Sequence, residues 1–585
     1  MPSPFSSSRL FSAAPILFVA LLWLLPFSLP DHKVPFGTFW QEWIAAGLLL
    51  SAIFFVLLQS SSALTLNLPQ IVIAPLGLTV VLALQCATGL LSMSAQVFIP
   101  MLYLLLAVFA CVLGSTMMQN GSLEKACTWI ALVCLAGGIF NVTVQIAQLL
   151  KVETTFPFMS PLLPGQRPFG NINQSNHIAA YLGMSLASVF YLRIQSRLSL
   201  ISTWITAVAL ITGLVLTGQR SAITYVCMPL VVVLLSWKIF VPQRKGLLWV
   251  SVALPILFVL MNMIVQSLSA GTASPLEMMA SKSFYSNRWV FWQHAWHMFQ
   301  THPLLGVGFD QFWAAFFDQI EQMPAVDEAP NHPHNLIAAL LAETGILGTL
   351  AVCVPVLIWL WRTRLAAASS LQWLALIQIL IISFHSLIEY PLWYSYFLIL
   401  LAFWLGATSV SGSAITLSHP RPYALAFAFL SLFVLSDLGS TYSKFRAAVW
   451  KVPHARIADI ATFTPPKPKA LDGLTNHWFF QRAVLFWLPD LRAIEPQTAA
   501  ENIALNQQAI NVAPSSATLY RQILLLVLSG RSDEAVHLMH RARLIFPDRY
   551  REMRLALIAA TKKWPQQFVP VLDRLVNDPI KSNVP

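Results

Sequence analysis

Charged residues are scarce in this chain of 585 residues. Asp, Glu, Lys and Arg make up only 10% of it, whereas 57% of the residues are hydrophobic. So little charge excludes an ordinary soluble domain, whose surface needs far more polar side chains. Cysteine is also scarce, and all six cysteines lie within apolar runs. The sequence therefore indicates neither a disulfide framework nor a cysteine-based metal site.

The polar clusters also lack the common motifs of nucleotide and metal chemistry. They contain no Walker phosphate loop, no His-Glu-x-x-His motif and no Asp-x-Asp pair. A glycine-rich turn runs from His302 to Gly308, but no lysine follows it, so it does not resemble a nucleotide loop. His332 and His334 have the spacing of a metal-binding pair without an obvious third ligand. We expect no cofactor, with a metal on this pair as the alternative.

Long apolar runs follow one another from the start of the chain to about residue 440. A bilayer needs about 20 apolar residues per helix, and that length predicts about 13 transmembrane helices. We therefore expect an all-α, polytopic membrane protein. The predicted spans are 11–29, 43–60, 70–91, 96–115, 126–149, 175–192, 199–217, 221–240, 246–266, 335–361, 370–388, 391–410 and 421–438.

The distribution of Lys and Arg predicts the orientation of these spans. The first apolar run lacks a small-residue cleavage site, so we interpret it as a retained span. With the N-terminus in the cytoplasm, the inner loops hold ten Lys and Arg and the short outer loops hold four. An odd number of spans then places residues 441–585 and the long loop 267–334 outside. We expect two domains, a membrane domain of residues 1–440 and a C-terminal domain of residues 441–585.

The C-terminal domain differs from the rest in composition, because it contains 19 of the 35 Lys and Arg and 11 Asp and Glu. A pattern around Pro514 recurs around Pro547, close to the 34-residue period of tetratricopeptide repeats. Gly530 and the residues after it resemble the turn between two repeat helices. We therefore predict a helical, TPR-like domain, with a plain helical bundle as the alternative.

Four polar clusters fall on the predicted outer side, and each has a structural as well as a functional interpretation. Amides at a helix entry bind sugars or cap helices, arginines bind phosphate or lie at the membrane surface, and aromatics form membrane belts. Residues 286–296 predict an amphipathic helix at the outer surface, with Arg288 at its start. The clusters are residues 165–177, 217–221, 286–296 and 385–394.

The segment from Asn331 to Asn335 lies at the entrance of the apolar run 335–361. Asn335 is a good N-cap residue for that helix. Glu343 follows about two and a half turns into the helix, where a carboxylate is costly unless it is used. His334 is therefore a candidate general base, with an ordinary helix entry as the alternative.

Three blocks of this sequence together resemble the O-antigen ligase and polymerase superfamily, and within it the pilin-type protein O-oligosaccharyltransferases (PglL type). Arg220 and Arg288 match as well, and the order along the chain is that of the family. The blocks are residues 170–182, 332–348 and 385–394.

The resemblance implies transfer of a preassembled glycan from undecaprenyl pyrophosphate to a Ser or Thr hydroxyl of a periplasmic protein such as pilin. It implies a metal-independent glycosyltransferase in the bacterial inner membrane, in contact with membrane lipid and with no nucleic-acid partner. We expect His334 to be the general base, and Arg288 and Arg220 to bind the pyrophosphate. The remaining site residues expected to bind or orient substrate are Arg167, Gln174, Asn176, His332, Asn335, Glu343, Glu389 and Tyr390.

Three alternatives remain open at this point. In the first alternative, the acceptor is lipid A core or a second glycan unit, as in other members of the superfamily. In the second, the protein is a transporter of polyprenyl-linked sugars. Against this, its polar residues cluster at one surface and not at the bilayer midplane, where a transporter binds its substrate. In the third, the protein is a receptor whose C-terminal domain binds partners and whose spans serve only as a membrane anchor. Against this, an anchor needs far fewer spans.

Overall fold

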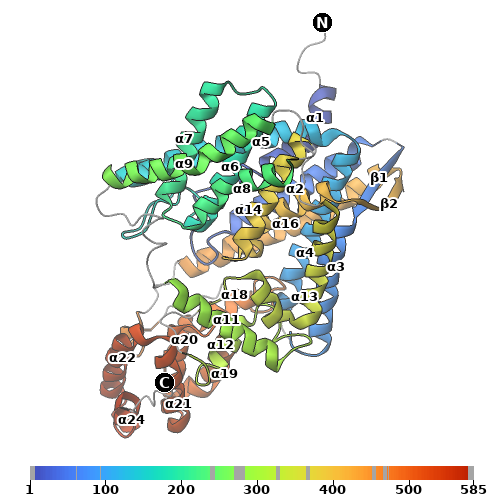
Figure 1. Ribbon diagram of the computed structural model, residues 1–585. Coiled ribbons are helices and arrows are strands. Elements are labelled where there is room, and N and C mark those ends of the chain that lie inside the picture. The colour runs from blue at the N-terminus through green and yellow to red at the C-terminus, as the bar shows by residue number, and fades with distance from the viewer. Residues whose placement is uncertain are drawn as a thin grey trace. The chain divides into compact units, whose positions relative to one another are not determined.

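The computed structural model describes residues 7–60, 62–91, 94–237, 244–268, 284–324, 330–363, 369–450, 456–464, 471 and 473–577. It is 74% helical, and the prediction of a polytopic α-helical membrane protein is confirmed (Figure 1). A helix overlaps each predicted span: α1 (Ser7–Leu21), α2 (Phe39–Gln59), α3 (Ile73–Ala87), α4 (Ser94–Gln119), α5 (Ser122–Leu150), α6 (Ser175–Ile194), α7 (Leu200–Leu216), α8 (Ser221–Leu235), α9 (Arg244–Leu268), α13 (Leu336–Thr363), α14 (Ser370–Ser386), α15 (Ser395–Thr408) and α16 (Pro420–Trp450).

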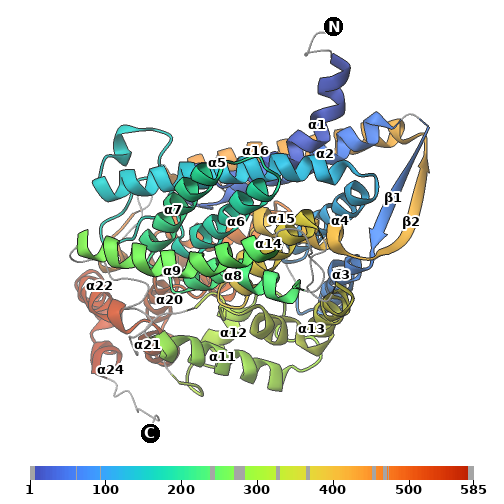
Figure 2. The ribbon, with the colours of Figure 1, turned by 45° about the horizontal axis from the view of Figure 1, so that its top comes forward.

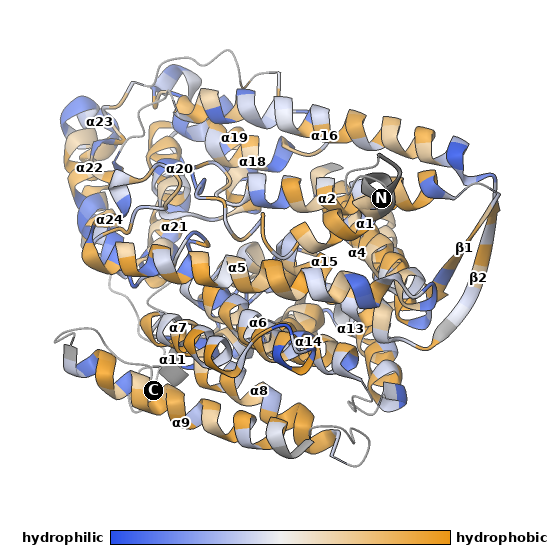
Figure 3. Cartoon of the chain, turned by 90° about the horizontal axis from the view of Figure 1, so that it is seen from above, coloured by the Kyte–Doolittle hydropathy of each residue, from blue (hydrophilic) through white to orange (hydrophobic). Residues whose placement is uncertain are grey.

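Not all of these helices are long enough to cross a bilayer by themselves. Within the described residues, 8 helices have the length and hydropathy of a membrane span, and α7, α8, α14 and α15 are shorter apolar helices. Figure 3 shows hydrophobic residues over most of α9, and Trp249 and Met263 of that helix are 72% and 60% exposed. Exposed apolar side chains of this kind suit a surface that faces lipid.

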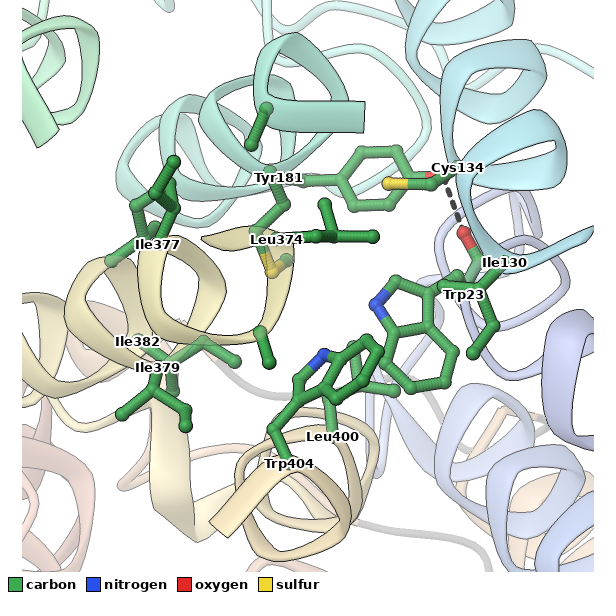
Figure 4. Close-up of a cluster of buried hydrophobic side chains, with 14 of the residues drawn as sticks. Trp23, Ile130, Cys134, Tyr181, Leu374, Ile377, Ile379, Ile382, Leu400 and Trp404 are labelled. Atoms are coloured by element: carbon green, nitrogen blue, oxygen red, sulfur yellow. Dashed lines mark hydrogen bonds between the residues drawn. The ribbon is translucent and has the colours of Figure 1, made fainter. Parts of the chain in front are cut away.

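The chain divides into two compact units, and the first contains most of the membrane helices. It comprises Met1–Thr79, Leu102–Lys282 and Leu350–Asp437. Its core lies around α6 and α14, where Trp23 and Trp404 both donate their indole N–H to Gln378 Oε1, at 2.7 and 2.8 Å. Figure 4 shows Trp23, Tyr181 and Trp404 in this core, with the Tyr181 hydroxyl donating to the Trp23 carbonyl at 2.6 Å. These hydrogen bonds pair the indole N–H groups of Trp23 and Trp404 and the Tyr181 hydroxyl inside the core.

A two-stranded antiparallel sheet in the first unit was not predicted. Strand β1 (Ala63–Pro69) pairs with β2 (Ser411–Ser418), and the two lie side by side in Figure 2. The leucines of β1 alternate with smaller or polar residues, which is the period of a strand. Both strands belong to loops that the predicted topology places on the cytoplasmic side. Their pairing agrees with that topology, because strands on opposite sides of a membrane do not meet.

The second unit comprises Val80–Met101, Ser283–Thr349 and Leu438–Pro585. It joins the end of the long loop 267–334 to the C-terminal residues, and its core includes Phe291 and Phe316 as well as Leu524 and Leu557. Whether residues 441–585 form a domain of their own stays a prediction. The helices of this unit beyond the membrane spans are α11 (Phe284–Thr301), α12 (Phe312–Asp318), α18 (Gln481–Trp487), α19 (Ala499–Val512), α20 (Ser516–Leu528), α21 (Ser532–Ile545), α22 (Tyr550–Lys563), α23 (Pro565–Phe568) and α24 (Leu572–Asn577).

Helices α19 to α22 repeat as two pairs, as the recurring proline pattern predicts. Helix α21 starts at Ser532, 33 residues after α19 starts at Ala499, and α22 follows α20 at a similar interval. Gly530, with φ of 76°, makes the turn between α20 and α21. Short 3-10 helices complete the chain: η1 (Gln70–Val72), η2 (Glu153–Thr155), η3 (Pro391–Trp393), η4 (Ile457–Asp459), η5 (Leu488–Leu491), η6 (Pro496–Thr498) and η7 (Pro547–Arg549).

Candidate functional site

The eleven candidate residues form two groups, one in each compact unit. The first unit holds Arg167, Gln174, Asn176, Arg220, Glu389 and Tyr390, and the second holds Arg288, His332, His334, Asn335 and Glu343.

Asn335 is the N-cap of α13, as predicted. Its side-chain Oδ1 accepts the backbone N–H of Ile337 at 2.9 Å and of Ala338 at 3.1 Å. His334, just before it, has a positive φ of 51° and is half-buried. This left-handed conformation is uncommon for a residue with a side chain, so the local structure must hold it.

Helix α11 supports the segment that carries His334. The Phe291 ring stacks on the His334 ring with centroids 6.1 Å apart, and Trp292 Nε1 donates to the Pro333 carbonyl at 3.1 Å. Arg288 lies one turn earlier on the same face of α11, at i−3 and i−4 from these two aromatics. Arg288 is thus carried by the face of α11 whose aromatic side chains contact the His334 segment.

His294, also in α11, is a structural histidine. It is buried against Phe316, with ring centroids 3.9 Å apart. Its Nδ1 accepts from Gln319 at 2.9 Å, which leaves the Nε2–H to donate to the Pro324 carbonyl at 3.2 Å. Burial lowers the pKa of His294 to about 4. The imidazole is therefore neutral near pH 7, with both nitrogens engaged.

Helix α13 is broken at Gly345, inside the sequence block 332–348. Gly345 has φ 61° and ψ −161°, which are not helical values. A Cβ at this position would lie 2.5 Å from the carbonyl carbon and oxygen of Leu304, so only glycine fits. Part of α13, Leu336–Thr344, is thus a short helix of its own, and the apolar sequence alone does not reveal this break.

The turn 302–308 satisfies the backbone groups that the break releases. Ile346 N–H donates to the Pro303 carbonyl at 2.8 Å, and the Val307 N–H donates to the Ala342 carbonyl at 2.9 Å. Gly308 N–H donates to the Glu343 carbonyl at 3.2 Å. Irregular backbone at membrane depth is tolerated where protein groups complete its hydrogen bonds.

Gln85 is a residue of this arrangement that sequence reasoning missed. It is fully buried, and its Nε2 donates to the carbonyls of Leu305 and Glu343 at 2.6 and 2.7 Å. Its Oε1 accepts the Phe309 N–H at 3.1 Å. An amide in the middle of the predicted span 70–91 was the signal that could have identified it.

Glu343 is buried, with an exposed fraction of 1%, and holds the loop after the turn. Its Oε2 accepts the Asp310 N–H at 3.1 Å. Among the described residues, its Oε1 has no hydrogen-bond partner. The costly carboxylate that the sequence places inside the apolar run is therefore used in positioning the loop.

In the first unit, Arg167 and Arg220 lie at the tight turn between α7 and α8. Arg167 donates to the Gly218 carbonyl at 2.7 Å. Burial and, to a smaller extent, the charge of Arg220 lower the pKa of the Arg167 guanidinium. Two neighbouring guanidinium groups favour an anionic ligand.

Asn176 and Glu389 join two of the sequence blocks that carry the family resemblance. Asn176 Nδ2 donates to Glu389 Oε1 at 2.9 Å, although the residues are 213 positions apart. The ring of His177, the next residue of α6, meets the His385 ring edge to face at 5.2 Å. His385 Nδ1 is hydrogen-bonded to the Tyr225 hydroxyl at 3.0 Å. This buried layer fixes the ends of α6, α8 and α14 against one another.

The remaining amides and tyrosine have clear structural contacts. Gln174 caps α6, because its Oε1 accepts the His177 N–H at 2.5 Å. Asn171, from the same amide-rich block, is buried and donates to the Ser28 and Phe158 carbonyls. Tyr390 is half-buried and stacks on Tyr394, with centroids 6.1 Å apart. Their predicted roles toward a glycan stay predictions.

His332 is buried, and the structure adds no ligand to the His332 and His334 pair. In the described ranges, His, Cys, Asp and Glu form no group of three suited to a metal ion. The metal alternative therefore gains no support from these residues.

Two segments of the chain match known protein families. Residues 205–353 match the family described as O-antigen ligase, and residues 373–557 match the family described as virulence factor membrane-bound polymerase, C-terminal. The chain is 23% identical over 526 residues to the general O-oligosaccharyltransferase of Acinetobacter baylyi, covering 87% of this chain and 89% of that protein. It is 23% identical over 401 residues to the ComP-specific O-oligosaccharyltransferase of the same organism, covering 67% and 70%.

These matches, together with the fold, support the class: the chain is similar to the O-antigen ligase superfamily of polytopic membrane proteins. Within that class it is similar over most of its length to protein O-oligosaccharyltransferases. The resemblance drawn from the sequence motifs is therefore confirmed.

Proposed function

We propose that this protein is an O-oligosaccharyltransferase, a glycosyltransferase that moves a preassembled glycan from a lipid-linked donor to a protein hydroxyl. The observation that carries this function is the similarity to two O-oligosaccharyltransferases over most of the chain. We further propose that the donor is undecaprenyl pyrophosphate-linked and that the acceptor is a Ser or Thr of a periplasmic protein such as pilin. The protein would then lie in the bacterial inner membrane, with its site and C-terminus in the periplasm.

In this reaction the hydroxyl oxygen of the acceptor attacks the anomeric carbon of the glycan. His334 accepts the hydroxyl proton as the new carbon–oxygen bond forms, which is the role of a general base. The bond between the anomeric carbon and the pyrophosphate breaks, and the pyrophosphate leaves with the bonding electron pair. Phe291 and Trp292 fix the segment around His334, which supports assigning the base to a position of restricted geometry.

The leaving pyrophosphate gains negative charge, so fixed cations lower the barrier to its departure. Arg288 and Arg220 have this role in our proposal, with Arg167 next to Arg220. Asn176 and Tyr390 position glycan or acceptor, Glu389 orients Asn176, and Gln174 holds the start of α6. His332, Asn335 and Glu343 keep the His334 segment in place.

An O-antigen ligase activity is the second candidate, because residues 205–353 match the family of that description. In that case the acceptor hydroxyl belongs to lipid A core or to another glycan. The chemistry at His334 is the same for both acceptors, so only the acceptor distinguishes them.

Reconstitution of the purified protein tests both. The protein is mixed with undecaprenyl pyrophosphate-linked glycan and, in separate reactions, with a secreted pilin-like protein or with lipid A core. Intact-mass analysis follows the gain of one glycan. Glycan on the protein alone supports the proposed function; glycan on lipid A core alone would establish the ligase instead.

His334→Ala tests the base in the same assay. The expected loss of rate is roughly 10²–10⁴-fold. His302→Ala is the matched control, because His302 is exposed and its ring contacts the neighbouring Thr301 hydroxyl. Parental transfer by His334→Ala would exclude His334 as the base, and wild-type activity that chelators abolish and zinc restores would favour the metal alternative.

A further inference from the structure

We propose that Arg482, in the C-terminal region, is a positioning residue for the segment that carries His334, and that it acts through Asp310 and Glu343. This inference rests on the proposed function of His334. It assigns a role to a residue of the C-terminal region that lies outside the three sequence blocks of the family resemblance.

Arg482 joins the C-terminal region to the loop after the 302–308 turn. Its two terminal nitrogens bind Asp310, one at 2.5 Å from the carboxylate Oδ2 and the other at 2.7 Å from the backbone carbonyl. The second nitrogen also donates to the Val512 carbonyl at 3.1 Å, at the end of α19. Only 16% of the Arg482 side chain is exposed. A guanidinium held at three acceptors has a fixed orientation, so it fixes the residue that it binds.

Asp310 is the link between Arg482 and the broken helix. Its φ of 59° is a left-handed conformation, which costs energy for a residue with a side chain. That conformation aims its N–H at Glu343 Oε2, 3.1 Å away. Arg482 holds both the carboxylate and the carbonyl of Asp310, and these contacts stabilise the strained geometry.

Glu343 transmits the position of Asp310 to His334. It lies near the end of the short helix Leu336–Thr344, and Asn335 caps the other end of that helix. A short, capped helix moves as one body, so a shift at Glu343 becomes a shift at Asn335 and His334. The backbone groups of Asp310 and Phe312 both interact with this carboxylate, so the loop that Arg482 holds restrains Glu343.

A second contact between the C-terminal region and the loop provides a matched control. Arg541 donates to the Phe317 carbonyl at 2.7 Å and pairs with Asp318 at 3.2 Å. Its side chain is 17% exposed, close to the value for Arg482. The chemistry is therefore similar, but Arg541 contacts α12, and among the described residues no hydrogen bond or ion pair joins it to Asp310 or Glu343.

Hydrogen–deuterium exchange on the full-length protein in nanodiscs tests the inference without any activity. Arg482→Ala is expected to speed exchange of the Val307, Gly308 and Asp310 amides about tenfold or more, because it removes charged hydrogen bonds. Arg541→Ala is expected to leave these three amides at the wild-type rate. Equal exchange in wild type and Arg482→Ala would overturn the positioning role, whatever the transfer assay gives.

Kinetics then separates positioning from acceptor docking. With a pilin-like acceptor, Arg482→Ala and the milder Asp310→Asn should lower kcat about tenfold with little change in the KM for acceptor, and Arg482→Lys should restore part of it. A rise in KM alone would overturn positioning in favour of docking. A wild-type protein that transfers no glycan, but shows the predicted exchange, would refute only the proposed function.

Discussion

Replacement of Gly345 by alanine is the sharpest test of the broken helix. The dihedral angles of this residue, φ 61° and ψ −161°, belong to a region that is essentially restricted to glycine. The new Cβ would also lie 2.5 Å from Leu304 backbone atoms and 2.7 Å from Gly306 N. Backbone atoms cannot rotate away as a side chain does, so the turn 302–308 has to move.

The expected cost follows from these contacts. Strain at a glycine-only conformation costs about 1–3 kcal/mol. Movement of the turn also weakens two hydrogen bonds, from Ile346 N–H to Pro303 at 2.8 Å and from Leu347 N–H to Leu304 at 3.3 Å, each worth about 1 kcal/mol. We therefore expect Gly345→Ala to destabilise this region by about 3–5 kcal/mol.

Thermal unfolding and glycan transfer measure the effect together. Gly345→Ala should melt at a lower temperature and lose transfer, because the short helix behind His334 loses its support. Gly246→Ala is the control, since a Cβ there meets no atom within 4 Å and Gly246 lies in α9. A Gly345→Ala protein with wild-type melting and wild-type transfer would refute the functional importance of the break.

Three further predictions are independent of Gly345. Arg288→Lys and Arg220→Lys should stay strongly impaired in transfer at normal protein levels, because lysine lacks the two-pronged donor of arginine; full activity of the alanine variants would leave both as surface charges. The pKa of His294 is about 4 in the folded protein and 6.5 in the unfolded chain. The unfolded chain therefore binds a proton first as the pH falls, so the free energy of unfolding is highest above pH 6.5 and decreases as the pH drops toward 4. The loss at pH 5 is about 2 kcal/mol, and His294→Gln should show less acid destabilisation in thermal melts. Reporter fusions after residue 440 should show alkaline phosphatase activity, and activity from a cytoplasmic reporter alone would contradict the predicted orientation.

The helices of this fold are predictable from sequence because apolar runs of sufficient length form helices in a bilayer. The predicted helix cap at Asn335 also follows from local chemistry, since its amide serves the first turn directly. The break at Gly345 is not predictable in this way. The run from Leu336 to Thr363 is mostly apolar, with Glu343 as its one acidic residue, and a glycine within it is equally consistent with close helix packing.

The candidate site was predictable only where its residues act through local patterns. Asn176 and Glu389 belong to separate sequence blocks, and their hydrogen bond depends on how α6 packs on α14. Asp310 and Arg482 have no shared motif and are 172 positions apart, so their ion pair is a product of tertiary structure. Sequence patterns identify the residue types needed for the chemistry, but the residues that hold them in place come from packing.

Deletion of the residues after about 445 tests whether the C-terminal region docks the acceptor, but the structure gives more than one reason for the deleted protein to lose activity. Activity lost on deletion is expected both from absent acceptor binding and from absent Arg482. The deletion also exposes the apolar side chains of α11 and α12, which pack in one core with α20 and α22. We therefore expect the deleted protein to be unstable as well as inactive.

Point variants separate the causes: substitutions on α19 and α21 that leave Arg482 in place should raise the KM for acceptor if this region docks it. Unchanged KM and kcat in those variants, with a low kcat in Arg482→Ala, would assign the C-terminal region to support of the His334 segment.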